Sequence, residues 1–87
     1  MLLAEKMAKA LEQEGIKVLG YEESKNPKYI DGEVTLENSF SVQVGKDYAC
    51  LCIVKGDDID YLLEEEEIDS EAEFAKKVAK FFLLKSE

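Results

Sequence analysis

The sequence has no arginine, no histidine and no tryptophan, and it has a single proline, Pro27. Without histidine, the chain lacks the side chain that most often exchanges protons near neutral pH. Without arginine, it lacks the planar guanidinium that grips a phosphate or carboxylate with two parallel hydrogen bonds. A serine or cysteine nucleophile would have no histidine to act as its base. We therefore expect a protein that is not an enzyme.

Long apolar segments are also missing. The longest apolar run, Ala49 to Val54, is far short of the roughly 20 residues that a membrane-spanning helix needs. Residues 1–6 do not combine a basic leader with an apolar stretch, so we expect no secretory signal. Two cysteines are too few for a disulfide-built secreted scaffold. These absences predict a cytoplasmic protein that does not contact a membrane.

Acidic side chains dominate the charge. Twenty aspartates and glutamates stand against eleven lysines, which leaves a net charge of −9. This balance disfavours direct nucleic-acid binding, because phosphate contacts need clustered basic residues. It favours a protein partner with a basic surface, although charge of this size also keeps many proteins soluble. The length of 87 residues, of which 46% are apolar, predicts one acidic globular domain over residues 1–87.

The pattern predicts a helix near each end of the chain. Residues 2–14 contain good helix formers, and Gly15 stands where a left-handed cap residue is needed. Ser70 and Glu73 have the spacing of a capping box. The apolar stripe that follows has helical spacing and consists of Phe74, Ala75, Val78, Ala79, Phe81 and Phe82.

Four strands are expected between these helices, at 16–21, 33–44, 48–54 and 59–68, with a loop from Glu22 to Gly32. In the first of them, Ile16 and Val18 should share one face, opposite Leu19 and Tyr21. Residues 59–68 also fit a helix, but Tyr-Leu-Leu and the adjoining turn at Gly56 favour a strand, with Ile59, Tyr61 and Leu63 on one side.

The second predicted strand has two interpretations. Its apolar residues alternate strictly from Val34 to Val44, which predicts one buried face. A hairpin with the three-residue loop 37–39 keeps this face intact and pairs Val34 with Val42. A single long strand, bent near Asn38, keeps it as well. We favour the long strand, because Asn-Ser is a weak turn signal.

Together these elements predict an α+β fold in the order α-β-β-β-β-α. Its largely antiparallel four-stranded sheet would carry both terminal helices on one face, covering the even-numbered apolar positions. The odd-numbered side of residues 48–54, made of Ala49, Leu51 and Ile53 with nearby Leu62, would then stay open. Such an open sheet face would favour a homodimer or another partner.

The two cysteines are the first candidates for chemistry. On a strand, Cys50 and Cys52 point to the same face, with α-carbons about 6.5–7 Å apart, at the outer limit for a disulfide. Metal binding usually needs three or four soft or imidazole ligands, which the chain lacks. We interpret both cysteines as small core residues and expect neither a metal nor a cofactor.

Residues 57–73, which we call the acidic band, contain ten carboxylates and no lysine. One interpretation is a solvated edge strand that charge protects from sheet-to-sheet pairing, followed by an acidic helix start. The other is a docking surface for a basic partner. The spacing does not fit a calcium-binding EF-hand loop. The expected partner-binding residues are Asp57, Asp58, Asp60, Tyr61, Glu64, Glu65, Glu66, Glu67 and Asp69.

Two functional hypotheses follow. The first is a small non-catalytic protein–protein interaction module, such as an adaptor, an immunity-type protein or a bacterial or phage accessory factor, which binds through the acidic band, the open sheet face, or both. The alternative is a nucleic-acid mimic that inhibits a DNA- or RNA-binding protein. A strand shows only alternate residues on each face, about 6.5 Å apart, so it imitates a phosphate row sparsely. The interaction module is therefore favoured.

Overall fold

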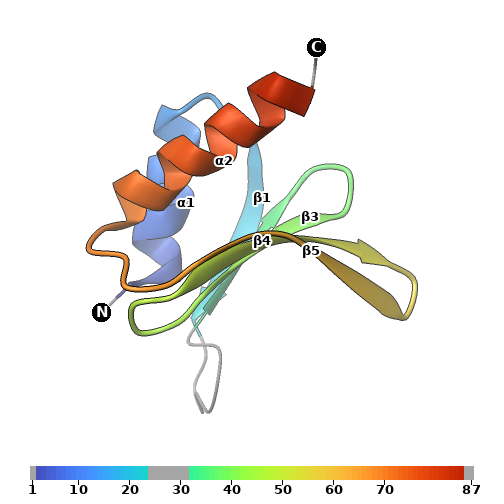
Figure 1. The fold of residues 1–87 in the computed structure, drawn as a ribbon, viewed down its shortest axis with the longest axis horizontal. Helices are drawn as coiled ribbons and strands as arrows, with labels where there is room; N and C mark the ends of the chain where they lie inside the picture. Colours follow the sequence, from blue (N-terminus) through green and yellow to red (C-terminus); the bar gives the residue numbers. More distant parts are fainter. Residues whose placement is uncertain (1, 24–31, 86–87) are drawn as a thin grey trace.

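In the part of the chain that the structure describes, two helices flank five strands, and each strand pairs antiparallel with the next one in sequence. The computed structural model describes residues 2–23 and 32–85. Both helices lie on one face of the sheet (Figure 1). The α+β class is confirmed, whereas the expected number of four strands is wrong by one. The elements are α1 (Ala4–Gln13), β1 (Val18–Glu23), β2 (Gly32–Leu36), β3 (Phe40–Val44), β4 (Ala49–Lys55), β5 (Asp58–Glu65) and α2 (Glu71–Lys85).

The extra strand arises because residues 33–44 form a hairpin and not the long bent strand that we favoured. Val34 pairs with Val42, as the three-residue loop predicts. Asn38 and Ser39 adopt left-handed backbone angles, with φ of 60° and 69°. This conformation is uncommon outside glycine, but asparagine tolerates it better than most residues. The hairpin buries the apolar side chains of β2 and β3 on one face, which offsets the cost of the loop.

The expectation of an open odd-numbered face on the following strand is wrong. Val44 pairs with Ala49, and Val42 pairs with Leu51. The turn between them has an even number of residues, so the even positions of β3 and the odd positions of β4 share one face. Ala49 and Leu51 are therefore fully buried with the helices. The opposite face, which we call the bare face, is the one that no helix covers (Figure 1).

The strand at 59–68 is confirmed as β5, but it ends at Glu65 and contains a bulge. Leu51 pairs with Leu63 and Cys52 pairs with Tyr61, so Leu62 is an extra residue. The bulge turns both Leu62 and Leu63 toward the core, whereas our prediction placed Leu63 on the side of Tyr61. A bulge inserts one residue without a partner, which reverses the alternation beyond it.

The first strand is shifted and bulged in the same way. We expected residues 16–21, and β1 spans Val18–Glu23. Val18 and Tyr21 stand opposite Leu36 and Val34, with Leu19 as the extra residue. Val18 and Tyr21 therefore share the helix-covered face, and our assignment of Tyr21 to the other face is wrong. Residues 24–31 of the expected loop lie outside the described residues.

Both helix predictions are confirmed. Gly15 follows α1 with a φ of 85°, the left-handed geometry expected of a cap. The Glu73 amide donates to Ser70 Oγ at 3.3 Å, which caps α2. Phe74 and Val78 are completely buried, and Phe82 is half-buried against the same core. The apolar stripe of α2 is therefore a core element along most of its length.

The start of α1 is held by two carboxylates that are distant in the sequence. Leu3, just before the helix, provides no side-chain cap. Glu23 accepts hydrogen bonds from the amides of Ala4 (2.7 Å) and Glu5 (3.3 Å). Glu71 accepts one from the amide of Leu3 at 2.8 Å. Helix N-termini leave their first amides without intrahelical acceptors and favour negative charge, so these contacts fix α1 to β1 and α2.

Candidate interaction surface

The bare face of the sheet carries two rows of side chains that run across four strands. The registers of neighbouring strands place these residues directly opposite one another, which puts their side chains on the same face. The first row is Glu33, Gln43, Cys50 and Glu64. The second row is Thr35, Ser41, Cys52 and Tyr61.

The centre of these rows is buried although no helix lies over it. Cys50 and Cys52 are fully buried, and Ser41 and Gln43 are 5% and 8% exposed. The Cys50 thiol donates to Gln43 Oε1 at 3.6 Å, and the Cys52 thiol donates to the Ser41 carbonyl at 3.5 Å. Ser41 Oγ donates to a backbone carbonyl of β2 at 3.3 Å. Buried polar groups are costly without partners, and these residues provide partners for one another.

The thiols on this face stay protonated at physiological pH. Burial, together with the neighbouring Cys50 and Glu33, raises the pKa of Cys52 from 9.0 to about 11. Burial also raises the pKa of Cys50, although a hydrogen bond with Tyr48 lowers it. A thiol reacts and binds metals as its thiolate. Both cysteines are free, and in this environment they pack as small neutral residues.

The β4–β5 hairpin extends away from the helices (Figure 1) and exposes apolar side chains at its end. Val54 pairs with Ile59, and Tyr61 is the next residue of β5 whose side chain lies on the bare face. These three residues, which we call the apolar tip, are 40%, 43% and 53% exposed. A hollow of about 380 Å³ lies beside the tip. It is lined by Glu33, Thr35, Ser39, Phe40, Ser41, Val54 and Gly56.

The residues expected to bind a partner follow one another along β5 and the segment beyond it, but they do not form one patch. The register puts Asp58, Asp60 and Glu65 on the helix side of β5, and Tyr61 and Glu64 on the bare face. Eight of the nine residues are exposed, and Glu65 is half-buried. The exposed members are Asp57, Asp58, Asp60, Tyr61, Glu64, Glu66, Glu67 and Asp69.

Only part of the acidic band is engaged within the molecule. Asp60 pairs with Lys55 at 3.2 Å, and Glu65 pairs with Lys77 at 3.3 Å. Glu71 is the carboxylate that holds the start of α1. Within residues 2–23 and 32–85, the other carboxylates of the band form no ion pair. Among the described residues, most of the band's carboxylates therefore have no lysine as a counter-ion.

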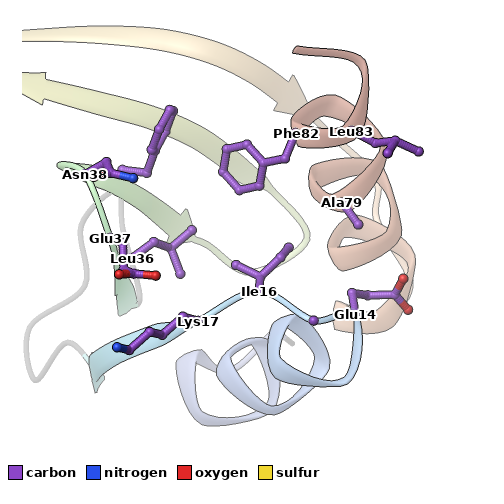
Figure 2. A pocket seen from close by; sticks show the side chains of 11 residues that line it. Glu14, Ile16, Lys17, Leu36, Glu37, Asn38, Ala79, Phe82 and Leu83 are labelled. Atoms are coloured by element: carbon purple, nitrogen blue, oxygen red, sulfur yellow. The ribbon is translucent and has the colours of Figure 1, made fainter. Parts of the chain in front are cut away.

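A second cavity, also of about 380 Å³, lies between the end of α1, the β2–β3 loop and the last turns of α2 (Figure 2). Ile16, Leu36 and Phe82 point into it, and Phe40 packs edge-on against Phe82 with ring centroids 4.9 Å apart. Lys17 lies at its margin. Glu14, Glu37 and Asn38 also line the cavity, so its lining is mixed. From the sequence, Phe82 was expected only as part of the core.

Tyr61 of the apolar tip was among the residues expected to bind a partner, whereas Val54 and Ile59 were not. Ile59 and Tyr61 were expected on one side of their strand, as they are. The exposed apolar face, however, was expected at Ala49, Leu51 and Ile53 with Leu62. The signal that could have revealed the tip is the hairpin turn at Gly56. Its two-residue length pairs Lys55 with Asp58 and sets Val54 beside Ile59.

Three further observations concern metal binding, membrane spanning and similarity to known proteins. Among the described residues, no three cysteine, aspartate or glutamate side chains come close enough to hold a metal ion. Neither helix is long and apolar enough, over its described residues, to cross a membrane. Comparisons with protein-family models, curated proteins and solved structures found no match to this chain.

Proposed function

We propose that this chain is a small non-catalytic interaction module that binds a partner with a basic surface through the β4–β5 hairpin and the acidic band. One observation carries the proposal. The apolar tip is exposed beside carboxylates, most of which lack a counter-ion within the described residues. An apolar centre with a charged rim is the usual composition of a protein–protein interface.

The arrangement exceeds what protection of the sheet edge requires. Charged side chains alone prevent edge strands from pairing with other sheets. Exposing Ile59 and Tyr61 beside those charges adds nothing to that protection and costs hydration free energy. A binding role gives these exposed side chains a use, because burying them against a partner recovers this free energy.

The distribution of carboxylates favours this proposal over the nucleic-acid mimic. A mimic needs closely spaced negative charge along one surface. Here, Asp58 and Asp60 lie on one side of β5, whereas Glu64 lies on the other. The tyrosine and isoleucine between them also interrupt any row of charge.

Affinity capture with a charge-reversed variant tests the proposal. The variant carries Glu64→Lys, Glu66→Lys and Glu67→Lys, and it spares Glu65 because that residue pairs with Lys77. The matched control carries Glu12→Lys, Glu22→Lys and Glu37→Lys, three exposed positions outside the band. Both triple variants change the net charge by the same amount.

We expect the control to retain a specific partner that the band variant loses, with binding that weakens as salt rises. Equal retention by both variants would remove the acidic band from the binding site. Release of the captured partner by added DNA or RNA would favour the mimic.

A further inference from the structure

The outer edge of β5 is an unpaired strand edge. In the described sheet, β5 pairs only with β4 and therefore forms one of the two edges. The end of its hairpin lies away from both helices (Figure 1). An exposed strand edge presents unpaired backbone groups, to which an extended segment of another chain can add as a further strand.

The two sides of this edge differ in chemistry over four consecutive residues. Asp58 and Asp60 lie on the helix side, and Ile59 and Tyr61 lie on the bare face. A strand added to β5 would place its own side chains alternately beside these two sets. Charge complementarity requires basic residues beside the aspartates, and the apolar tip requires apolar residues beside Ile59 and Tyr61.

The same chemistry argues against a second copy of this chain as the occupant. Two β5 edges placed together would bring aspartates and glutamates of one copy beside those of the other. Like charges opposite one another destabilise strand pairing. The bulge at Leu62 interrupts the regular pairing of β5 just beyond Tyr61. The part of the edge to which a strand can add with regular alternation is therefore Asp58–Tyr61, which is long enough for a short segment only.

We infer that the binding partner supplies an extended segment in which lysine or arginine alternates with apolar residues, and that this segment adds to β5 as a sixth strand. The inference rests on the proposed function, and it identifies the partner's conformation and its sequence pattern. Lys55 already pairs with Asp60, so it competes with the incoming basic residue.

Two blocked peptides of identical composition test the inference. One alternates lysine and valine, and the other groups its lysines in one half and its valines in the other. Both are titrated into the isotopically labelled protein at low salt, with amide chemical shifts as the readout. We expect the alternating peptide to bind about tenfold more tightly, because several cross-strand pairs each contribute a small gain. The largest shifts should fall at Asp58–Tyr61.

Backbone methylation separates strand addition from side-chain docking. In one derivative of the alternating peptide, every lysine amide is N-methylated, and in another every valine amide is. Amides of alternate residues in a strand point to opposite edges, so one derivative should lose binding and the other should keep it. Similar affinities for both derivatives would overturn the inference.

Point variants locate the site. Tyr61→Thr should weaken the alternating peptide, whereas Leu19→Thr, an exposed apolar position on the opposite edge strand, should not. Lys55→Ala should tighten binding.

The two proposals can fail separately. If the alternating and block peptides bind the native protein equally, and neither binds the band variant, strand addition is refuted and the proposed function stands. Absence of binding by both peptides at low salt would refute both.

Discussion

The helix-covered face and the bare face of the sheet both contain fully buried residues, but the two faces differ in chemistry. On the covered face, Val34, Val42 and Leu51 pack beneath the helices. On the bare face, Cys50 and Cys52 are buried to the same extent, among hydrogen-bonding neighbours. These side chains are short and stand in register beside longer ones. The comparison teaches that inaccessibility to solvent does not by itself identify the apolar core of a small domain.

The largest expected difference between the faces comes from truncating one buried side chain on each. Phe74→Ala removes a fully buried ring from the helix-covered core and should cost about 3–5 kcal/mol of unfolding free energy. Cys52→Ala removes a single sulfur atom on the bare face and should cost about 1 kcal/mol. Urea denaturation measures both values. Similar losses of unfolding free energy for the two variants would mean that the buried side chains of the bare face stabilise the fold as much as those beneath the helices.

Two glycines provide the next comparison. A Cβ at Gly32 would lie 2.8 Å from Ala4 Cβ and 3.0 Å from a Glu23 carboxylate oxygen, whereas a Cβ at Gly20 would meet nothing within 4 Å. Gly20 faces the bare side, since it pairs with Thr35. We expect Gly32→Ala to destabilise the protein by about 1–3 kcal/mol and Gly20→Ala to leave its melting temperature unchanged or slightly higher. A tolerated Gly32→Ala would show that α1 does not need this close approach.

Adjacent glutamates on β1 give a third, smaller contrast. Glu23 holds the first amides of α1, so Glu23→Ala should cost about 1 kcal/mol in chemical denaturation. Glu22 stands opposite Glu33 on the bare face, and like charges in that position repel. Glu22→Ala should therefore leave stability unchanged or raise it slightly. If the two variants behave alike, the cap contributes no stability.

The last effect concerns pH and is confined to alkaline solution, so it is absent from measurements near neutral pH. An ordinary thiol ionises near pH 9.0, whereas the Cys52 pKa in the folded protein is about 11. Between these values the unfolded chain has lost protons that the folded protein retains, so unfolding free energy should fall as pH rises from 9 to 11. Below pH 9 this contribution is complete and constant. Thermal melts between pH 9 and 11 should show that stability declines less steeply with pH in the Cys50→Ala, Cys52→Ala double variant than in the native protein. Equally steep declines in the two proteins would contradict a raised thiol pKa as the cause.

The sequence allowed prediction of the fold where local signals were strong. The cap at Ser70 and the stripe from Phe74 onward located α2, because capping chemistry and helical spacing are local properties. The exposure of the acidic band followed from its charge. The missed fifth strand came from the turn at Asn38 and Ser39, a weak local signal. The errors in assigning side chains to a face came from single-residue changes in phase. The even-length turn before Ala49 and the bulges at Leu19 and Leu62 each changed which face later residues occupy, and only pairing with neighbouring strands determines such changes.

The carboxylate of Glu71 has a consequence for the order in which the protein assembles during synthesis. It accepts its hydrogen bond from Leu3, 68 positions earlier in the chain. A ribosome releases the residues of α1 before Glu23, and Glu23 before Glu71. Until Glu71 emerges, one amide at the start of α1 lacks its native acceptor. Although α1 is made before α2, it is therefore among the last of the described elements to gain its full set of native contacts.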